Sequence, residues 1–96
     1  MDVEPLHTRV EKTIQIRSGD IVLESPNGFP LDESNLYLIA KNGNIIWKAE
    51  KPDPDTLFSR MRLDEDGAIL STYTIHGHAC DLDLRTGKII SQTKIQ

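Results

Sequence analysis

The residues with the greatest chemical potential lie in one short stretch, residues 76–81, with the sequence His-Gly-His-Ala-Cys-Asp. On a continuous strand, His76, His78 and Cys80 point to one face and are spaced about 6.6 Å apart. Two imidazoles and a thiolate are donors that zinc and copper accept. The spacing therefore predicts a small metal-binding site formed by these three side chains.

A second interpretation of the same stretch needs no metal. Gly77 falls where a tight turn is expected, and a turn there would separate His76 from the other two donors. Cys80 shares its parity with Leu82 and Leu84, which also suits a small core residue. The histidines are then exposed turn residues beside a buried thiol. Cysteine catalysis by Cys80 would need His76 or His78 within reach as the base and also an oxyanion hole. A histidine two residues away can lie close, but nothing else in the sequence suggests such a site, so we expect no enzyme.

Two acidic clusters are explained by hairpin structure. Residues 64–67, Asp-Glu-Asp-Gly, lack the spaced oxygen ligands and the distant Glu of a calcium loop and are typical of a turn. Asp81 and Asp83 alternate with apolar residues, so we expect them on the solvent face of a strand. The sequence indicates no cleft in which such carboxylates would act as acid and base.

Three apolar residues are candidates for contact with a partner protein, namely Phe29, Leu31 and Trp47. Phe29 and Leu31 belong to residues 25–34, the longest irregular segment, and functional contacts concentrate on such loops. Trp47 shares a strand face with smaller apolar residues. This pattern indicates packing in the core or in a subunit interface, with exposed ligand stacking as the alternative.

Composition limits the classes of function. The 96 residues suffice for one domain, and the net charge of −4 comes from fifteen acidic residues with eleven basic residues scattered among them. Nucleic-acid binding is not expected, because it requires a basic patch. No apolar run approaches the ~18 residues of a membrane span, and the N-terminal residues lack a signal-peptide pattern. We therefore expect a cytoplasmic protein without membrane contact. Cys80 is the only cysteine, which excludes an intramolecular disulfide.

Alternation of apolar and polar residues predicts about eight short strands in a single β domain. The chain is expected to consist of an N-terminal tail or edge extension at residues 1–11 and two strand units at about residues 12–50 and 57–96. Between the units, Pro52 and Pro54 fix φ and withhold ladder donors, which marks a linker. A short helix over residues 55–61, capped by Asp55, is the alternative to a strand in that segment.

The two units are similar to each other in sequence. Residues 41–46 align with residues 85–90 at an offset of 44, and residues 18–23 align with residues 66–71 at an offset of 48. A period of ~40–50 residues that carries four strands is typical of a propeller blade.

Residues 35–47, Asn-Leu-Tyr-Leu-Ile-Ala-Lys-Asn-Gly-Asn-Ile-Ile-Trp, resemble the blade repeat of the quinoprotein-type (PQQ-like) β-propellers. In that repeat a strand, an Asp-x-x-Gly-like turn and a closing Trp recur. Residues 66–90 resemble the same repeat, with residues 82–88 fitting best, although Ser91 stands at the second Trp position. Two blades cannot close a ring of at least four. The resemblance thus implies the strand and turn pattern of a blade, and no quinone cofactor is carried over.

We therefore expect an all-β domain in which two blade-like meander units pack as a small sandwich or open barrel. Exposed sheet edges are usually covered, so the expected function is a non-catalytic interaction module that self-associates or binds a protein partner. The alternative is a small metal-binding protein that holds zinc or copper with His76, His78 and Cys80.

Overall fold

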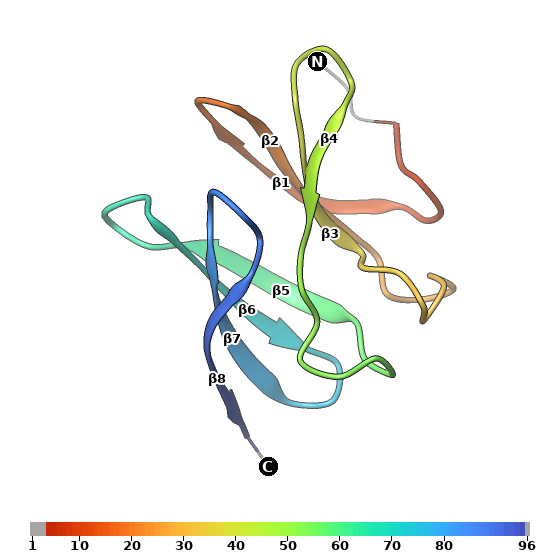
Figure 1. Ribbon diagram of the computed structural model, residues 1–96. Helices are drawn as coiled ribbons and strands as arrows, with labels where there is room; N and C mark the ends of the chain where they lie inside the picture. The colour runs from red at the N-terminus through yellow and green to blue at the C-terminus, as the bar shows by residue number, and fades with distance from the viewer. Residues whose placement is uncertain (1–3, 96) are drawn as a thin grey trace.

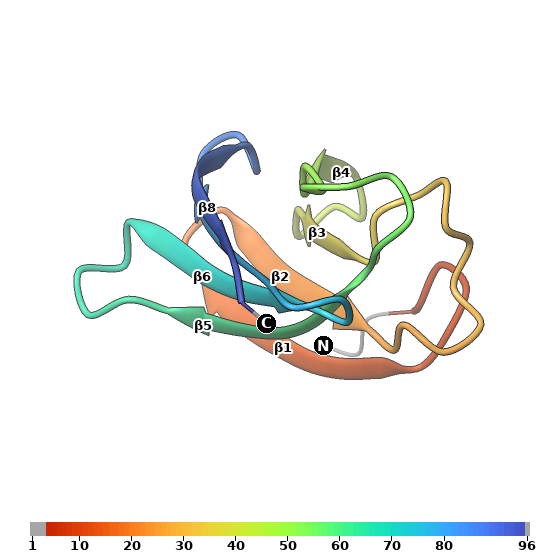
Figure 2. The same cartoon turned by 90° about the horizontal axis from the view of Figure 1, so that it is seen from below.

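Apolar residues at alternating positions form the inner faces of two antiparallel sheets, which pack against each other as a sandwich (Figure 1, Figure 2). The computed structural model describes residues 4–95. In both sheets, strands that follow one another along the chain are hydrogen-bonded neighbours. The first sheet consists of β1 (Val10–Ile16), β2 (Gly19–Glu24), β3 (Leu36–Ile39) and β4 (Ile45–Lys48). The second sheet consists of β5 (Phe58–Leu63), β6 (Ile69–Thr74), β7 (His78–Asp83) and β8 (Ile89–Lys94).

The architecture confirms the predicted fold class, because eight antiparallel strands form two four-stranded meanders in a sandwich that does not close into a barrel. The predicted strand units contain β1–β4 and β5–β8, although β1 begins at Val10, within the segment expected as a tail. Residues 55–61 form no helix, and Phe58 begins β5 with its side chain in the core. Residues 4–95 contain no helix that is long and apolar enough to cross a membrane.

The core lies between the two sheets and is built mainly from leucine and isoleucine. Its fully buried members come from both sheets, and they are Ile21, Leu36, Leu38, Phe58, Leu70 and Leu82. Burial of each such side chain contributes about 1.5–3 kcal/mol. Contact between the inner faces is therefore the main force that holds the two sheets together.

A buried amide joins the two sheets. Asn35 lies directly before β3 and is fully buried. Its Nδ2 donates to the main-chain oxygens of Glu24 and Phe58, both at 2.7 Å, and its Oδ1 accepts from the Phe58 N–H at 2.8 Å. Because Phe58 begins β5, the Asn35 side chain pairs with this edge strand much as a neighbouring strand would. The amide thereby fixes the position of the first sheet against β5.

A second junction forms where Trp47 of β4 contacts the turn between β7 and β8. The indole Nε1–H donates to the main-chain oxygen of Leu84 at 2.8 Å. Glu50 extends the junction, because its N–H donates to the Gly87 oxygen and its carboxylate accepts from the Ile89 N–H, both at 2.8 Å. Gly87 leaves no room for a side chain, since a Cβ there would lie 2.5 Å from the indole Cε3.

Replacement of Asn35 by alanine should lower the free energy of unfolding by about 2–4 kcal/mol, because buried main-chain groups of Glu24 and Phe58 lose their partners. Urea unfolding followed by Trp47 fluorescence measures the loss. The control is Asn42→Ala, which removes an exposed amide whose Oδ1 accepts a bond from the Asn44 N–H. A loss for Asn35→Ala no larger than that of the control would contradict the role of the amide as a joint.

The indole contact is tested by comparing Gly87→Ala with Gly67→Ala. Both glycines have a positive φ, 73° and 70°, so both alanines carry a similar backbone strain of about 1–2 kcal/mol. A Cβ at Gly67 meets open space, whereas a Cβ at Gly87 collides with the Trp47 ring. We expect Gly87→Ala to cost about 1–3 kcal/mol more in urea unfolding than Gly67→Ala. Equal losses of unfolding free energy in the two variants would show that the Trp47 ring does not restrict the turn at Gly87.

Candidate functional site

The structure separates the predicted metal ligands along a turn and a strand. His76 lies in the β6–β7 turn, His78 opens β7, and Cys80 lies within β7 in the core. The Nδ1 atom of His76 is 2.9 Å from the Thr56 hydroxyl, and that of His78 is 3.0 Å from the Thr74 hydroxyl. Within residues 4–95, no three His, Cys, Asp or Glu side chains gather in a group that could hold a metal ion. Metal binding stays a prediction.

The Cys80 thiol occupies the core position that the second interpretation of its stretch predicts. It is buried at 2% exposure and belongs to the cluster between the sheets. Burial and the negative charge of Asp81 raise the pKa of the thiol, and a hydrogen bond with Thr72 offsets this only in part. Because the thiolate is the form that reacts and binds metals, the raised pKa favours an inert thiol at neutral pH.

The three residues predicted for partner contact lie in different surroundings. Phe29 is 4% exposed and meets the His7 ring edge to face, with ring centres 5.0 Å apart. Trp47 is 7% exposed and packs between the sheets, as the core interpretation of its strand predicts. Leu31 is 49% exposed. Of these three side chains, Leu31 therefore has the largest surface available to a partner, and its role stays a prediction.

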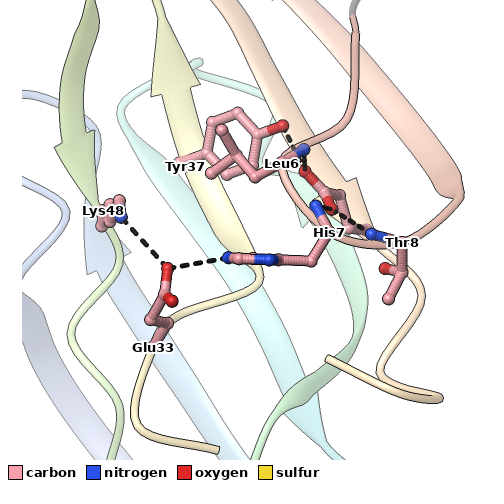
Figure 3. Close-up of polar contacts among 7 residues, drawn as sticks. Leu6, His7, Thr8, Glu33, Tyr37 and Lys48 are labelled. Atoms are coloured by element: carbon pink, nitrogen blue, oxygen red, sulfur yellow. Dashed lines mark hydrogen bonds and ion pairs between the residues drawn. The ribbon is translucent and has the colours of Figure 1, made fainter. Parts of the chain in front are cut away.

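A buried carboxylate that the sequence analysis did not single out organises the outer face of the first sheet. Glu24, the last residue of β2, is fully buried. It accepts hydrogen bonds from the N–H groups of Leu6, His7 and Thr8 at 2.7, 3.0 and 2.9 Å and from the Tyr37 hydroxyl at 2.5 Å (Figure 3). These four bonds engage both carboxylate oxygens. The segment before β1 is thus held across the sheet by an ionised side chain.

The protonation state of Glu24 follows from two opposing effects. Burial alone raises the pKa of a carboxyl, but the bonds from Thr8, Tyr37, Leu6 and His7 together outweigh it and leave the pKa of Glu24 below its usual value. Burial and the nearby Glu24 charge raise the pKa of the Tyr37 phenol. Glu24 is therefore ionised and Tyr37 neutral at pH 7, which suits an anchor and not a proton-transfer pair.

An exposed ion cluster supports the same cover. Glu33 of the long loop lies 3.1 Å from the His7 ring and 3.5 Å from the Lys48 ammonium (Figure 3). The hydrogen bond with His7 is the main reason that the pKa of Glu33 is lowered. Under this cover, Val22 and Tyr37 on the outer face of the first sheet are fully buried. The chain therefore covers the part of this face around Val22 and Tyr37, whereas Thr13 and Lys48 in the same cross-strand row stay exposed.

The outer face of the second sheet is open to solvent. Two rows of paired residues run across its strands. One row consists of Arg62, Ser71, Asp81 and Ser91, and the other consists of Arg60, Tyr73, Ala79 and Thr93. Both arginines are exposed, and the Tyr73 ring is 46% exposed. Tyrosine is normally buried in part at a site where its hydroxyl finds a partner, so an exposed ring beside two arginines marks a surface of unusual composition.

A groove of about 460 Å³ runs along this face and is called the basic groove below. Its polar lining consists of Lys12, Arg60, Arg62, Ser71, Thr72, Tyr73 and Asp81. Lys12 reaches it from β1 of the first sheet, and its Nζ donates to the Met61 oxygen of β5 at 2.9 Å. The groove is therefore shared by the two sheets, which is why no local sequence pattern indicated it.

The basic groove carries an excess of positive charge. Its single lining carboxylate, Asp81, already accepts hydrogen bonds from the Ser71 and Ser91 hydroxyls at 3.2 and 3.3 Å. Neither Arg60 nor Arg62 forms a salt bridge with a carboxylate of residues 4–95. Free guanidinium groups bind carboxylates and phosphates by paired, charge-assisted hydrogen bonds. The groove is therefore suited to binding an anionic group.

Comparison with known proteins gives one family match. A family model described as a domain of unknown function (DUF7957) matches residues 3–94. A search of curated proteins gives no match.

Glu24→Gln should destabilise the protein at pH 7 by about 2–3 kcal/mol, because the amide cannot accept all four hydrogen bonds and its NH₂ group faces donors. The folded-state pKa of Glu24 lies below its unfolded value of about 4.5. Its ionisation therefore stabilises the fold fully above that value and ceases to do so as the pH falls through the folded-state pKa. The stability difference between wild type and Glu24→Gln should shrink accordingly in urea unfolding at decreasing pH. The control, Glu33→Gln at the exposed cluster, should show little change.

Proposed function

The chain belongs to the DUF7957 family of domains of unknown function, and we propose that it is a non-catalytic interaction domain that binds a partner protein through the outer face of its second sheet. The observation that carries the proposal is the exposure, beside the Tyr73 ring, of Arg60 and Arg62, which form no salt bridge within residues 4–95. Arginine and tyrosine contribute a disproportionate share of the binding energy at protein interfaces.

The asymmetry of the two outer faces supports this choice of surface. On the first sheet, the segment held by Glu24 already occupies the place that a partner would take and buries Tyr37. On the second sheet, the outer-face aromatic residue Tyr73 of β6 keeps nearly half of its surface exposed. A partner segment over Tyr73 would cover this residue much as the segment before β1 covers Tyr37.

The size of the open face limits the kind of contact. Four strands of about six residues give a face of about 20 Å by 19 Å, or roughly 400 Å². A standard protein interface buries about 800 Å² per partner. The face therefore suits a peptide-like segment or a transient contact. A larger partner would also cover Ile75 and Ile95, which are exposed at the β6–β7 end of the sheet.

The proposal predicts that Arg60→Ala and Tyr73→Ala each weaken partner binding by at least about tenfold, as expected for residues that cost more than about 1.4 kcal/mol on truncation. Wild-type protein and variants are immobilised and exposed to extract of the native host. A retained protein is then purified and titrated by calorimetry. The matched controls are Arg85→Ala, which also removes one exposed arginine, and Ile90→Ala, which removes an exposed apolar side chain on β8. Equal binding by all variants would contradict the assignment of this face.

Light scattering over a dilution series tests whether a second copy takes the place of the partner. We expect a monomer at all concentrations, because like charges on a chain of net charge −4 oppose self-association. A dimer that dissociates on Arg60→Ala would replace the foreign partner with a second copy at the same face.

A further inference from the structure

We infer that the basic groove binds an extended, acidic segment of the partner, with carboxylates at alternate positions lying over Arg60 and Arg62. This inference rests on the proposed function and specifies the chemistry of the partner. It follows from three features of the groove, namely its excess of positive charge, the spacing of its two arginines along β5 and the position of its one lining carboxylate.

The first feature is local charge that opposes the charge of the whole chain. Lys12, Arg60 and Arg62 line the groove with only Asp81 against them, in a chain whose net charge is −4. The groove therefore carries a charge of +2, and the rest of the chain carries −6. An acidic segment is attracted to the groove, whereas the rest of the chain carries a net negative charge, so electrostatics favours an acidic ligand at this surface.

The second feature is spacing. Arg60 and Arg62 lie on one face of β5, about 6.8 Å apart along the strand. Alternate side chains of an extended peptide have the same separation. A segment that runs along β5 can therefore place successive carboxylates over the two guanidiniums without a bend. Consecutive acidic residues would point to opposite sides, and only half of them would face the groove.

The third feature is the order of residues across the sheet. One row runs from Arg62 through Ser71 to Asp81, and the next runs from Arg60 through Tyr73 to Ala79. Asp81 on β7 repels a carboxylate placed above it, so the acidic side chains lie toward β5. The exposed Tyr73 ring sits beside them and can stack against the segment's neutral residues. The face thus has a basic side and a neutral side.

Lys12 sets where the segment lies. Its Nζ donates to the Met61 oxygen, so one main-chain acceptor of β5 is already taken by a side chain of β1. The segment therefore lies over the face of the sheet instead of adding to β5 as a further strand. The ammonium group supplies a third positive charge next to the two guanidiniums.

A phosphate backbone is the rival anionic ligand. A single nucleic-acid strand presents charge at every nucleotide, and its binding is favoured by a continuous basic stripe. Asp81 interrupts such a stripe on this face, and the chain as a whole is acidic. The observations therefore favour carboxylates on a protein segment.

The test titrates the isotope-labelled full chain with three short synthetic peptides and follows its amide signals by NMR. In the first peptide Glu alternates with Thr, in the second the same residues are arranged with Glu contiguous, and in the third Gln replaces Glu. We expect the alternating peptide to shift signals around Arg60, Arg62 and Tyr73, and to bind at least about tenfold more tightly than the Gln peptide. Binding should weaken as NaCl rises from about 0.05 M to about 0.5 M.

Variants locate the binding site on the chain. The double variant Arg60→Gln/Arg62→Gln should lose at least about tenfold in affinity for the alternating peptide. The matched double variant Arg17→Gln/Arg85→Gln removes two exposed arginines from the turns after β1 and β7 and should bind as wild type does. Urea unfolding of both double variants confirms that the fold is kept, because all four side chains are exposed.

Several outcomes would overturn the inference. The groove is not the binding site if the alternating peptide shifts no amide signals, or if the two double variants lose the same affinity for it. If the contiguous peptide binds as tightly as the alternating peptide, the spacing of Arg60 and Arg62 does not select alternate carboxylates. Tighter binding of inorganic phosphate or of an oligonucleotide assigns the groove to phosphate. If the peptides fail while Arg60→Ala still releases a captured partner, the acidic segment is wrong and the proposed function stands.

Discussion

The buried amide of Asn35 is the constraint on which the arrangement of the two sheets depends. Apolar burial between the inner faces is strong but has no direction, so it does not by itself fix how one sheet sits on the other. Asn35 supplies that direction, because its two donors and one acceptor meet fixed main-chain groups of Glu24 and Phe58. A shift of one sheet along the other would break these bonds in the protein interior, where no water replaces them.

Glu24 connects this joint to the cover of the first sheet. Its main-chain oxygen accepts from Asn35, and its carboxylate holds the N–H groups of residues 6–8. One residue thus takes part both in joining the sheets and in covering the first of them. The second sheet has no equivalent residue among those described, since Tyr73 and its neighbours remain open. The difference between the two faces therefore begins at a single buried carboxylate.

The sequence was sufficient to predict the fold class, because period-two alternation and glycine turns act locally along each strand. It also predicted Cys80 as a possible core residue from the parity of Leu82 and Leu84. It could not reveal Glu24 as an anchor, because the N–H groups that satisfy it lie 16 to 18 residues away and belong to the segment expected as a tail. The sequence also did not indicate the basic groove, because the contribution of Lys12 depends on how the two sheets pack.

The basic groove is consequently a property of the assembled sandwich and not of either sheet. Two of its cations come from β5 and the third from β1, and Asn35 is bound to β5 at Phe58, the residue at which that strand begins. The bond between Lys12 and Met61 then brings the ammonium to the same strand. The buried amide and the exposed groove are therefore connected through β5, although the two sites share no side chain.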